Sequence, residues 1–133
     1  MRIVLDANVI IAAFAARGLC ESVLELCLDS HELLLSEALL AEIRGNLHRK
    51  IKLPIHTVDQ IEHILRANGT LFVPEAIPSN ACRDPGDAHV LGLTVAGQAE
   101  CLVTGDGDLL VLKRFRRCQI LNPREFSILI HRK

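Results

Sequence analysis

The sequence predicts an α/β protein, built as a three-layer α/β/α sandwich around a parallel sheet. Short runs that are apolar throughout recur along the chain, and segments with helical periodicity or helix caps separate them. Strands buried on both faces lack polar alternation, and parallel strands need helical crossovers that cover the sheet. Because 133 residues suffice for one domain with one core, we expect a single domain over residues 1–133.

The first half of the chain begins with an apolar run at residues 2–5, which predicts a buried strand, as does the run at residues 32–35. Two helices are expected between them, the second over about residues 19–29. Ser36 is a good N-cap for a helix whose apolar residues fall on one face. Apolar spacing from Val58 to Leu65 predicts another helix, followed by a strand at residues 71–73.

The second half begins its regular structure at Asp84-Pro85, where the aspartate caps a helix and proline takes the first helical position. Residues 101–104 predict a strand that ends at the loop Gly105–Asp108. A last strand is expected at residues 119–121, before Asn122-Pro123 opens a terminal helix.

Composition narrows the classes of function. The formal net charge is -1, so the chain lacks the basic footprint of a constitutive DNA binder. No apolar run has the length of a membrane span, and a charge at Asp6 comes too early for a signal peptide, so we expect a cytoplasmic protein with no membrane contact. The five cysteines form no CxxC pair and the histidines no HExxH motif, which favours buried reduced thiols over zinc ligands.

Acidic residues follow two of the predicted strands. Asp6 comes directly after the first strand, and Asp106 lies just beyond the strand at residues 101–104. Ligands of parallel sheets bind at the carboxyl ends of the strands, so the two carboxylates are expected at the same edge. Each aspartate alone is equally well explained as a turn or cap residue.

Asp87 is set apart from its neighbour Asp84 by the helix that follows. Val90, Leu91, Thr94 and Val95 lie three, four, seven and eight positions after Asp87 and define the inward face of the helix, which places the Asp87 carboxylate toward the core. A lone ionised carboxylate there is costly unless it is paired or bound to a metal, whereas Asp84 is sufficiently explained as the N-cap. Glu42 and Glu37 flank the apolar stripe of the preceding helix, and geometry alone does not separate a functional glutamate from a solvated one.

Clustered carboxylates repel one another, and a divalent cation resolves the repulsion. All-oxygen ligands suit Mg²⁺ or Mn²⁺, which leave positions for water and phosphate. Such a centre activates water for in-line attack on a phosphodiester.

Five motifs in order resemble the PIN-domain family, and within it the bacterial and archaeal VapC-like toxins. They are LDANVI (residues 5–10) against LDTNVL, SEALLAEI (36–43) against SxxLxxEI, CRDPGD (82–87) against RDPDD, VTGDGDLL (103–110) against VTGDKDLL, and NPREF (122–126) against TPxEF. The chain departs from these patterns at Ala7, Gly86, Ala88 and Gly107, which removes charge around the acids but none of the acids themselves.

The resemblance implies a parallel α/β/α fold, a Mg²⁺ or Mn²⁺ centre and endoribonuclease activity, with an antitoxin that occludes the site and a homodimeric toxin. Carried over by position, the catalytic and metal-binding acids are Asp6, Glu42, Asp87 and Asp106. Asp108 is an auxiliary ligand, and Asn8 and Thr104 are supporting polar residues.

Two basic clusters, residues 44–52 and 113–117, are candidates to flank the carboxylates and hold RNA phosphates, with solvated surface as the alternative. Other functions stay open at this point: a PIN nuclease that is not a toxin, a non-catalytic PIN module that binds proteins, and aspartyl-phosphate chemistry. The last is disfavoured because an amide, Asn8, takes the second acidic position of a DxD motif.

Overall fold

The computed structural model describes residues 1–131, and its centre is a six-stranded sheet in the order β3-β2-β1-β4-β6-β5. The strands are β1 (Arg2–Leu5), β2 (Glu32–Leu35), β3 (Gly69–Leu71), β4 (Cys101–Val103), β5 (Arg114–Phe115) and β6 (Cys118–Leu121). Every neighbouring pair is parallel except β5 with β6. The predicted α/β class with a parallel sheet is confirmed. The short antiparallel edge strand β5 was not predicted, because Arg114 and Phe115 form no apolar run.

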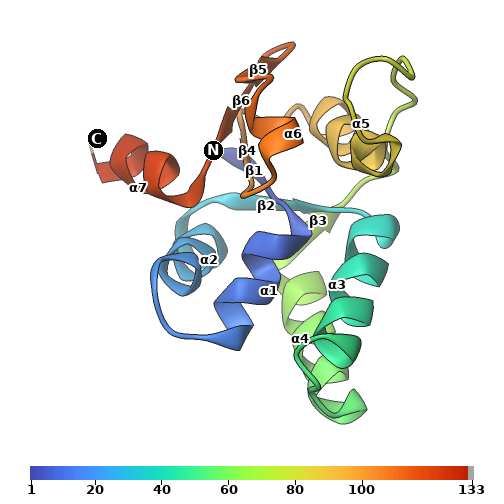
Figure 1. Ribbon diagram of the computed structural model, residues 1–133. Helices are drawn as coiled ribbons and strands as arrows, with labels where there is room; N and C mark the ends of the chain where they lie inside the picture. Colours follow the sequence, from blue (N-terminus) through green and yellow to red (C-terminus); the bar gives the residue numbers. More distant parts are fainter. Residues whose placement is uncertain (132–133) are drawn as a thin grey trace.

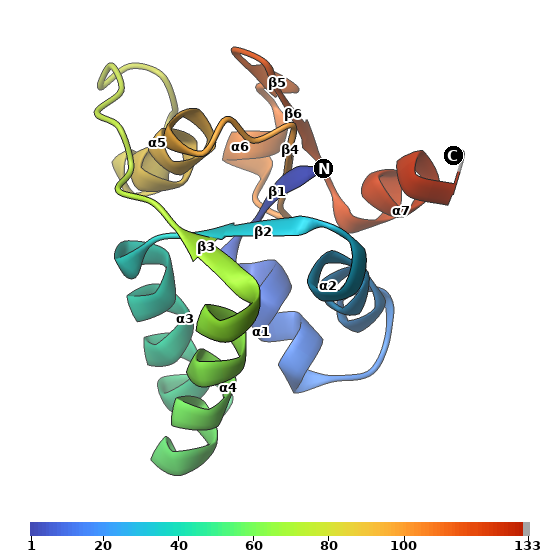
Figure 2. The same ribbon diagram turned by 180° about the vertical axis from the view of Figure 1, so that it is seen from behind.

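Helices cover both faces of this sheet. They are α1 (Ala7–Ala15), α2 (Leu19–Ser30), α3 (Glu37–Arg49), α4 (Ile55–Asn68), α5 (Ala88–Ala96), α6 (Gly107–Leu110) and α7 (Pro123–His131), with a 3₁₀ turn, η1 (Pro85–Asp87), before α5. Both views place α5 on one side of β1 and β2, and α1 and α2 on the other (Figure 1 and Figure 2). The three-layer arrangement expected from the sequence is therefore observed.

The core is aliphatic, and it fixes where the central strands end. Residues 3–5, 33–35 and 101–103 are at most 2% exposed, so both faces of these strands are covered. Burial of one such side chain stabilises the fold by roughly 1.5–3 kcal/mol. Polar residues follow directly where these apolar runs end, at Asp6, Ser36 and Thr104, and these three side chains are also buried.

Local capping chemistry begins the helices as the sequence predicts. Ser36 Oγ accepts the N–H of Leu39 at 3.1 Å, and Asp84 Oδ1 accepts the N–H of Gly86 at 2.9 Å, with Pro85 next in the chain. At α7, Asn122 and Glu125 each accept the other's backbone N–H. These bonds satisfy helix donors that have no partner inside the helix.

The third strand is displaced from its predicted position. It covers Gly69–Leu71 rather than residues 71–73, and Val73 is 87% exposed. A Cβ on Gly69 would lie 2.5 Å from Cδ1 of Leu35, so the strand begins where glycine permits close approach to β2. The apolar pattern does not reveal this requirement.

Two further expectations concern cysteine chemistry and membranes. All five cysteines are free thiols, and Cys20 is the only one of them that is not buried. No helix within residues 1–131 combines the length and the apolar character that a bilayer crossing requires.

The strand order reverses in the middle of the sheet, between β1 and β4. From β1 the chain moves outward through β2 to β3, and then returns to place β4 on the opposite side of β1. Helices therefore leave β1 and β4 toward opposite parts of the sheet. In open α/β sheets this switch in strand order is where ligands bind, at the carboxyl ends of the strands.

Candidate metal centre

Asp6 and Thr104 are joined directly at this switch point. Asp6 follows β1 and caps α1, with its Oδ1 accepting the N–H of Ala7 at 2.8 Å. Thr104 follows β4, and its hydroxyl donates to Asp6 Oδ2 at 2.7 Å. Both carboxylate oxygens of Asp6 are thus hydrogen-bonded, and the side chain is held in one orientation.

Asp106 is positioned by the same threonine. Its backbone N–H donates to Thr104 Oγ1 at 3.0 Å, and its Oδ1 accepts the N–H of Asp108 at 2.9 Å as the cap of α6. The sequence predicted only a loop here, whereas the structure forms a one-turn helix. That turn carries Asp108 back toward Asp106.

Asp87 approaches from another part of the chain. It ends η1 and immediately precedes α5. Of the residues predicted to face inward there, Val90, Leu91 and Thr94 are buried, whereas Val95 is half-buried. The Asp87 carboxylate lies close to that of Asp106, and its Oδ2 is buried without a hydrogen-bond partner. A buried carboxylate oxygen without a hydrogen-bond partner destabilises the folded protein. The described residues supply no such partner, so this oxygen can bind a ligand from outside the protein.

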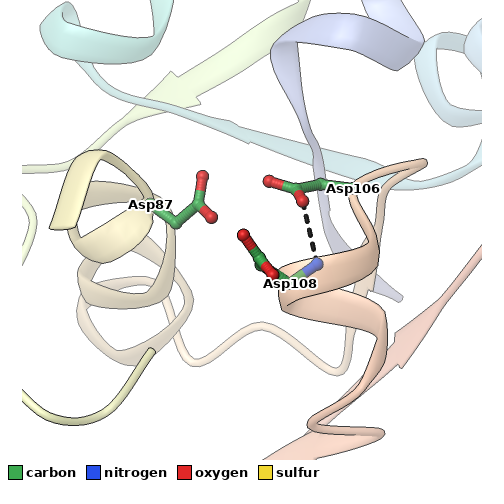
Figure 3. A group of neighbouring side chains, drawn as sticks. All are labelled: Asp87, Asp106 and Asp108. Carbon is green, nitrogen blue, oxygen red and sulfur yellow. Dashed lines mark hydrogen bonds between the residues drawn. The ribbon is translucent and has the colours of Figure 1, made fainter. Parts of the chain in front are cut away.

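Asp87, Asp106 and Asp108 form the tightest carboxylate group in the described residues. One oxygen from each lies within 4.8 Å of the others. Figure 3 shows the three side chains turned toward a common space, Asp87 from the start of α5 and the other two from the loop and turn after β4. Asp6 lies beside this group, bridged to Asp106 by Thr104.

The electrostatics of the group favour a bound cation. Burial and the neighbouring carboxylates, above all Asp106, raise the pKa of Asp87 from 3.8 to about 7. Burial also raises the pKa of Asp6, against the lowering effect of the bonds from Thr104 and Ala7. Near neutral pH the cluster therefore needs either a shared proton or a cation to offset its repulsion.

The residues present fit a hard divalent ion. The donor set is entirely carboxylate oxygen, which suits Mg²⁺ or Mn²⁺ rather than zinc. The unpartnered Oδ2 of Asp87 is an available ligand atom. Asp87, Asp106 and Asp108 would hold the ion, with Asp6 next to them.

Glu42 is not part of this three-carboxylate group. Its Oε1 lies 3.2 Å from Nε2 of His89, a residue of α5 that the sequence did not single out. His89 is near enough to Asp6 to lower the pKa of that carboxyl. Sequence periodicity offered no signal for His89, because it lies two positions after Asp87 and faces a partner 47 residues away.

The two glutamates of α3 have separate environments. Glu37 accepts two hydrogen bonds from Arg66, at 2.6 and 2.8 Å, and these bonds lower its pKa. It is thus a structural link between α3 and α4, and not merely a solvated flank. Glu42 faces His89 and the start of α5 instead, toward the carboxylates.

The remaining predicted positions differ in their contacts. Asp108, expected only as an auxiliary ligand, is a full member of the group and lies 3.7 Å from Nη1 of Arg83. Asn8 is exposed and its side chain makes no hydrogen bond to residues 1–131. Thr104 alone of the two predicted supporting residues is bonded to the acids.

The basic clusters do not lie as the sequence suggested. Arg116 and Arg117 line a pocket at the amino edge of the sheet, on the opposite side from the carboxylates. In the other cluster, Arg44 binds Asp59 and Glu62 at 2.7 Å each. The hypothesis that the cluster at residues 113–117 flanks the acids is wrong for Arg116 and Arg117, because a short hairpin carries them to the other edge.

Comparison with known proteins agrees with this geometry. A family model described as the PIN domain matches residues 2–108. A chain in the crystal structure of VapBC2 from Rickettsia felis, bound to a DNA fragment from its promoter, superposes with a TM-score of 0.62. It is 15% identical, and the match covers 92% of this chain and 98% of that one, so the likeness concerns the fold. No curated protein sequence matches significantly.

Proposed function

Because this chain belongs to the PIN-domain family, whose model covers residues 2–108, we propose that it is a divalent-metal-dependent endoribonuclease, the toxin of a toxin–antitoxin pair. The observation that carries the proposal is the convergence of Asp87, Asp106 and Asp108 at the switch point, with a buried Asp87 oxygen that has no partner. Arrays of carboxylates of this kind serve phosphodiester hydrolysis through metal ions.

The protein's contribution to the reaction is positioning and charge. When bound, Mg²⁺ or Mn²⁺ supplies charge neutralisation of the scissile phosphate and lowers the pKa of water. Asp87, Asp106 and Asp108 hold the ion, and Thr104 keeps Asp6 and the Asp106 backbone in register. Asp6, whose two oxygens accept bonds from Ala7 and Thr104, adds a fixed negative charge beside the ion. Glu42 of α3 and His89 of α5 together form one side of the site.

The proposal extends to partners. RNA is the substrate, a cognate antitoxin protein covers the carboxylates, and the toxin acts as a homodimer. The resemblance to VapC-like toxins supports these partners, and the structural neighbour is itself a VapBC2 protein of R. felis.

A non-catalytic PIN module that binds another protein is the second candidate. The retained acids speak against it, because binding alone gives no reason to keep a repulsive carboxylate group with a raised pKa. A PIN nuclease outside any toxin–antitoxin pair would use the same chemistry. A small antitoxin reading frame beside the gene would identify the protein as a toxin instead.

The test is cleavage of single-stranded RNA by the purified chain with Mn²⁺ or Mg²⁺. We expect products with 5′-phosphate and 3′-hydroxyl ends, and no cleavage in EDTA or by Asp106→Asn. Asp29→Asn, an exposed acid at the end of α2, is the matched control and should cleave normally. Cleavage that persists in EDTA, or that yields cyclic phosphates, would refute the metal-dependent mechanism.

A further inference from the structure

A pocket of about 390 Å³ opens at the amino edge of the sheet. Its walls come from Arg2 at the start of β1, from the turn between α5 and β4, and from the hairpin of β5 and β6. Since β1 and β4 are short, a rise of about 3.3 Å per residue puts this edge roughly 10–13 Å from the carboxyl ends. The pocket is therefore separate from the candidate metal centre.

The pocket carries an excess of positive charge. Arg2, Arg116 and Arg117 line it together with a single acid, Glu100. Arg2 is already engaged, because its Nε donates to the carbonyl oxygen of Gln98 at 2.9 Å and its Nη2 lies 3.8 Å from Glu100. Within residues 1–131, Arg116 and Arg117 take part in no ion pair. Two guanidinium groups are thus uncompensated at the pocket.

The backbone holds these arginines in an unusual position. Phe115 pairs with Cys118 across the sheet, so Arg116 and Arg117 are the two loop residues of a tight hairpin. Arg116 has φ 53°, a conformation that such turns ordinarily assign to glycine or asparagine. Gln98, also in the pocket wall, has φ 53°. Strained positions of this kind cluster at binding sites.

The hairpin also holds an aromatic ring beside the charges. The Arg116 guanidinium lies over the Phe115 ring, with its central carbon 5.2 Å from the ring centroid, so the two groups are stacked. Arg114 Nη1 donates to the Arg117 carbonyl oxygen at 3.4 Å, which supports the loop. Stacked arginine and phenylalanine surfaces bind nucleobases, and guanidinium forks bind phosphate in bidentate fashion.

We propose that this pocket binds a 5′-phosphorylated nucleotide, with the phosphate on Arg116 and Arg117 and the base packed against the Phe115–Arg116 stack. The volume lies within the range of about 300–1,000 Å³ that small-molecule pockets occupy. The phosphate can belong to a free nucleotide or to the 5′ end of an RNA strand, because both offer the same group. The site does not depend on the carboxylates.

Calorimetric titration of the Asp106→Asn chain in EDTA tests the proposal without the metal centre or RNA hydrolysis. The probes are adenosine 5′-monophosphate, a 5′-phosphorylated trinucleotide and unphosphorylated adenosine. We expect a phosphorylated probe to bind and adenosine to bind far more weakly. Arg117→Gln should weaken binding by about tenfold or more, the effect of one charge-assisted hydrogen bond. Arg17→Gln, an exposed arginine outside the pocket, is the charge-matched control.

Arg116→Gly separates binding from folding. Glycine adopts a positive φ without strain, so the melting temperature should not fall. The affinity for the phosphorylated probe should fall, because one guanidinium group is removed. Binding of the mononucleotide identifies a free nucleotide as ligand, and binding of the trinucleotide alone identifies an RNA end; either supports the site. The proposal would be overturned if neither phosphorylated probe bound at millimolar concentration, or if adenosine bound equally well. Unchanged affinity in Arg116→Gly and Arg117→Gln would also overturn it.

Discussion

The hydroxyl of Thr104 lies 2.7 Å from Oδ2 of Asp6 and donates a buried hydrogen bond across 98 positions of sequence. The Thr104 hydroxyl oxygen also accepts the backbone N–H of Asp106, so one hydroxyl orients two acids that follow neighbouring strands. Hydrogen bonds from neighbouring side chains to metal ligands fix the orientation of those ligands.

Thr104→Val should loosen the centre while keeping the side-chain volume. It leaves a buried Asp6 oxygen and the Asp106 N–H without a partner, so the unfolding free energy should fall by about 1–3 kcal/mol. Mn²⁺ affinity should fall by about 10–100-fold. Denaturant unfolding and calorimetry measure the two effects.

Thr94→Val is the control for this substitution. Thr94 is equally buried, but its hydroxyl donates to the Leu91 carbonyl oxygen inside α5, at 2.6 Å. It should lose some stability and bind Mn²⁺ normally. Equal metal affinity in the two valine variants would mean that Thr104 does not position the acids.

Asp87 and Asp84 should differ in their effect on activity. Asn caps a helix about as well as Asp but is a poorer ligand for a hard cation. Asp84→Asn should therefore retain most RNA cleavage and nearly all stability. Asp87→Asn should lose cleavage by orders of magnitude, yet melt at an equal or higher temperature without metal, because repulsion with Asp106 is relieved. If folded Asp84→Asn proved equally inactive, its assignment as a cap would be wrong.

The metal-free protein should lose stability between about pH 4 and pH 7. The pKa of Asp87 is raised from 3.8 in the unfolded chain to about 7 when folded, so in this window the folded protein holds the extra proton. Stability from this group is complete below the lower pKa, declines as pH rises, and is lost above the higher one. The raised pKa of Asp6 acts in the same direction.

Thermal melts of the wild type and of Asp87→Asn, in EDTA at intervals from pH 4 to 8, measure this effect as a difference. The difference should change steadily up to about pH 7 and then level off. Mn²⁺ affinity of the wild type should rise over the same interval, since the cation competes with the proton. A difference in melting temperature that stays constant across the range would contradict the raised pKa of Asp87.

Glu42→Gln and Glu37→Gln form a matched pair on one helix. Glu42 faces His89 beside the carboxylates, so its replacement should reduce RNA cleavage strongly while changing the melting temperature little. Glu37 binds Arg66, so Glu37→Gln should lower the melting temperature slightly and leave cleavage intact. Parallel cleavage assays and melts on both variants decide this. Normal cleavage by Glu42→Gln would remove Glu42 from the catalytic set.

The sequence by itself determined the features that depend on neighbouring residues. Apolar runs located β1, β2, β4 and β6, because continuous burial requires continuous apolarity. Ser36 and Asp84 marked helix starts, because a cap is made within three residues of the chain. The placement of Asp6 and Asp106 after parallel strands was enough to predict that they share an edge, since parallel strands end on the same side.

Only the tertiary structure decided which of these acids meet, because packing sets those contacts and periodicity does not. Asp108 joined Asp87 and Asp106 through the turn of α6, while Glu42 turned instead to His89 on α5. The hairpin of β5 and β6 reversed the chain and carried Arg116 and Arg117 to the opposite edge. Strand order and antiparallel pairing are non-local, so a linear pattern of charges does not reveal which edge of a sheet they occupy.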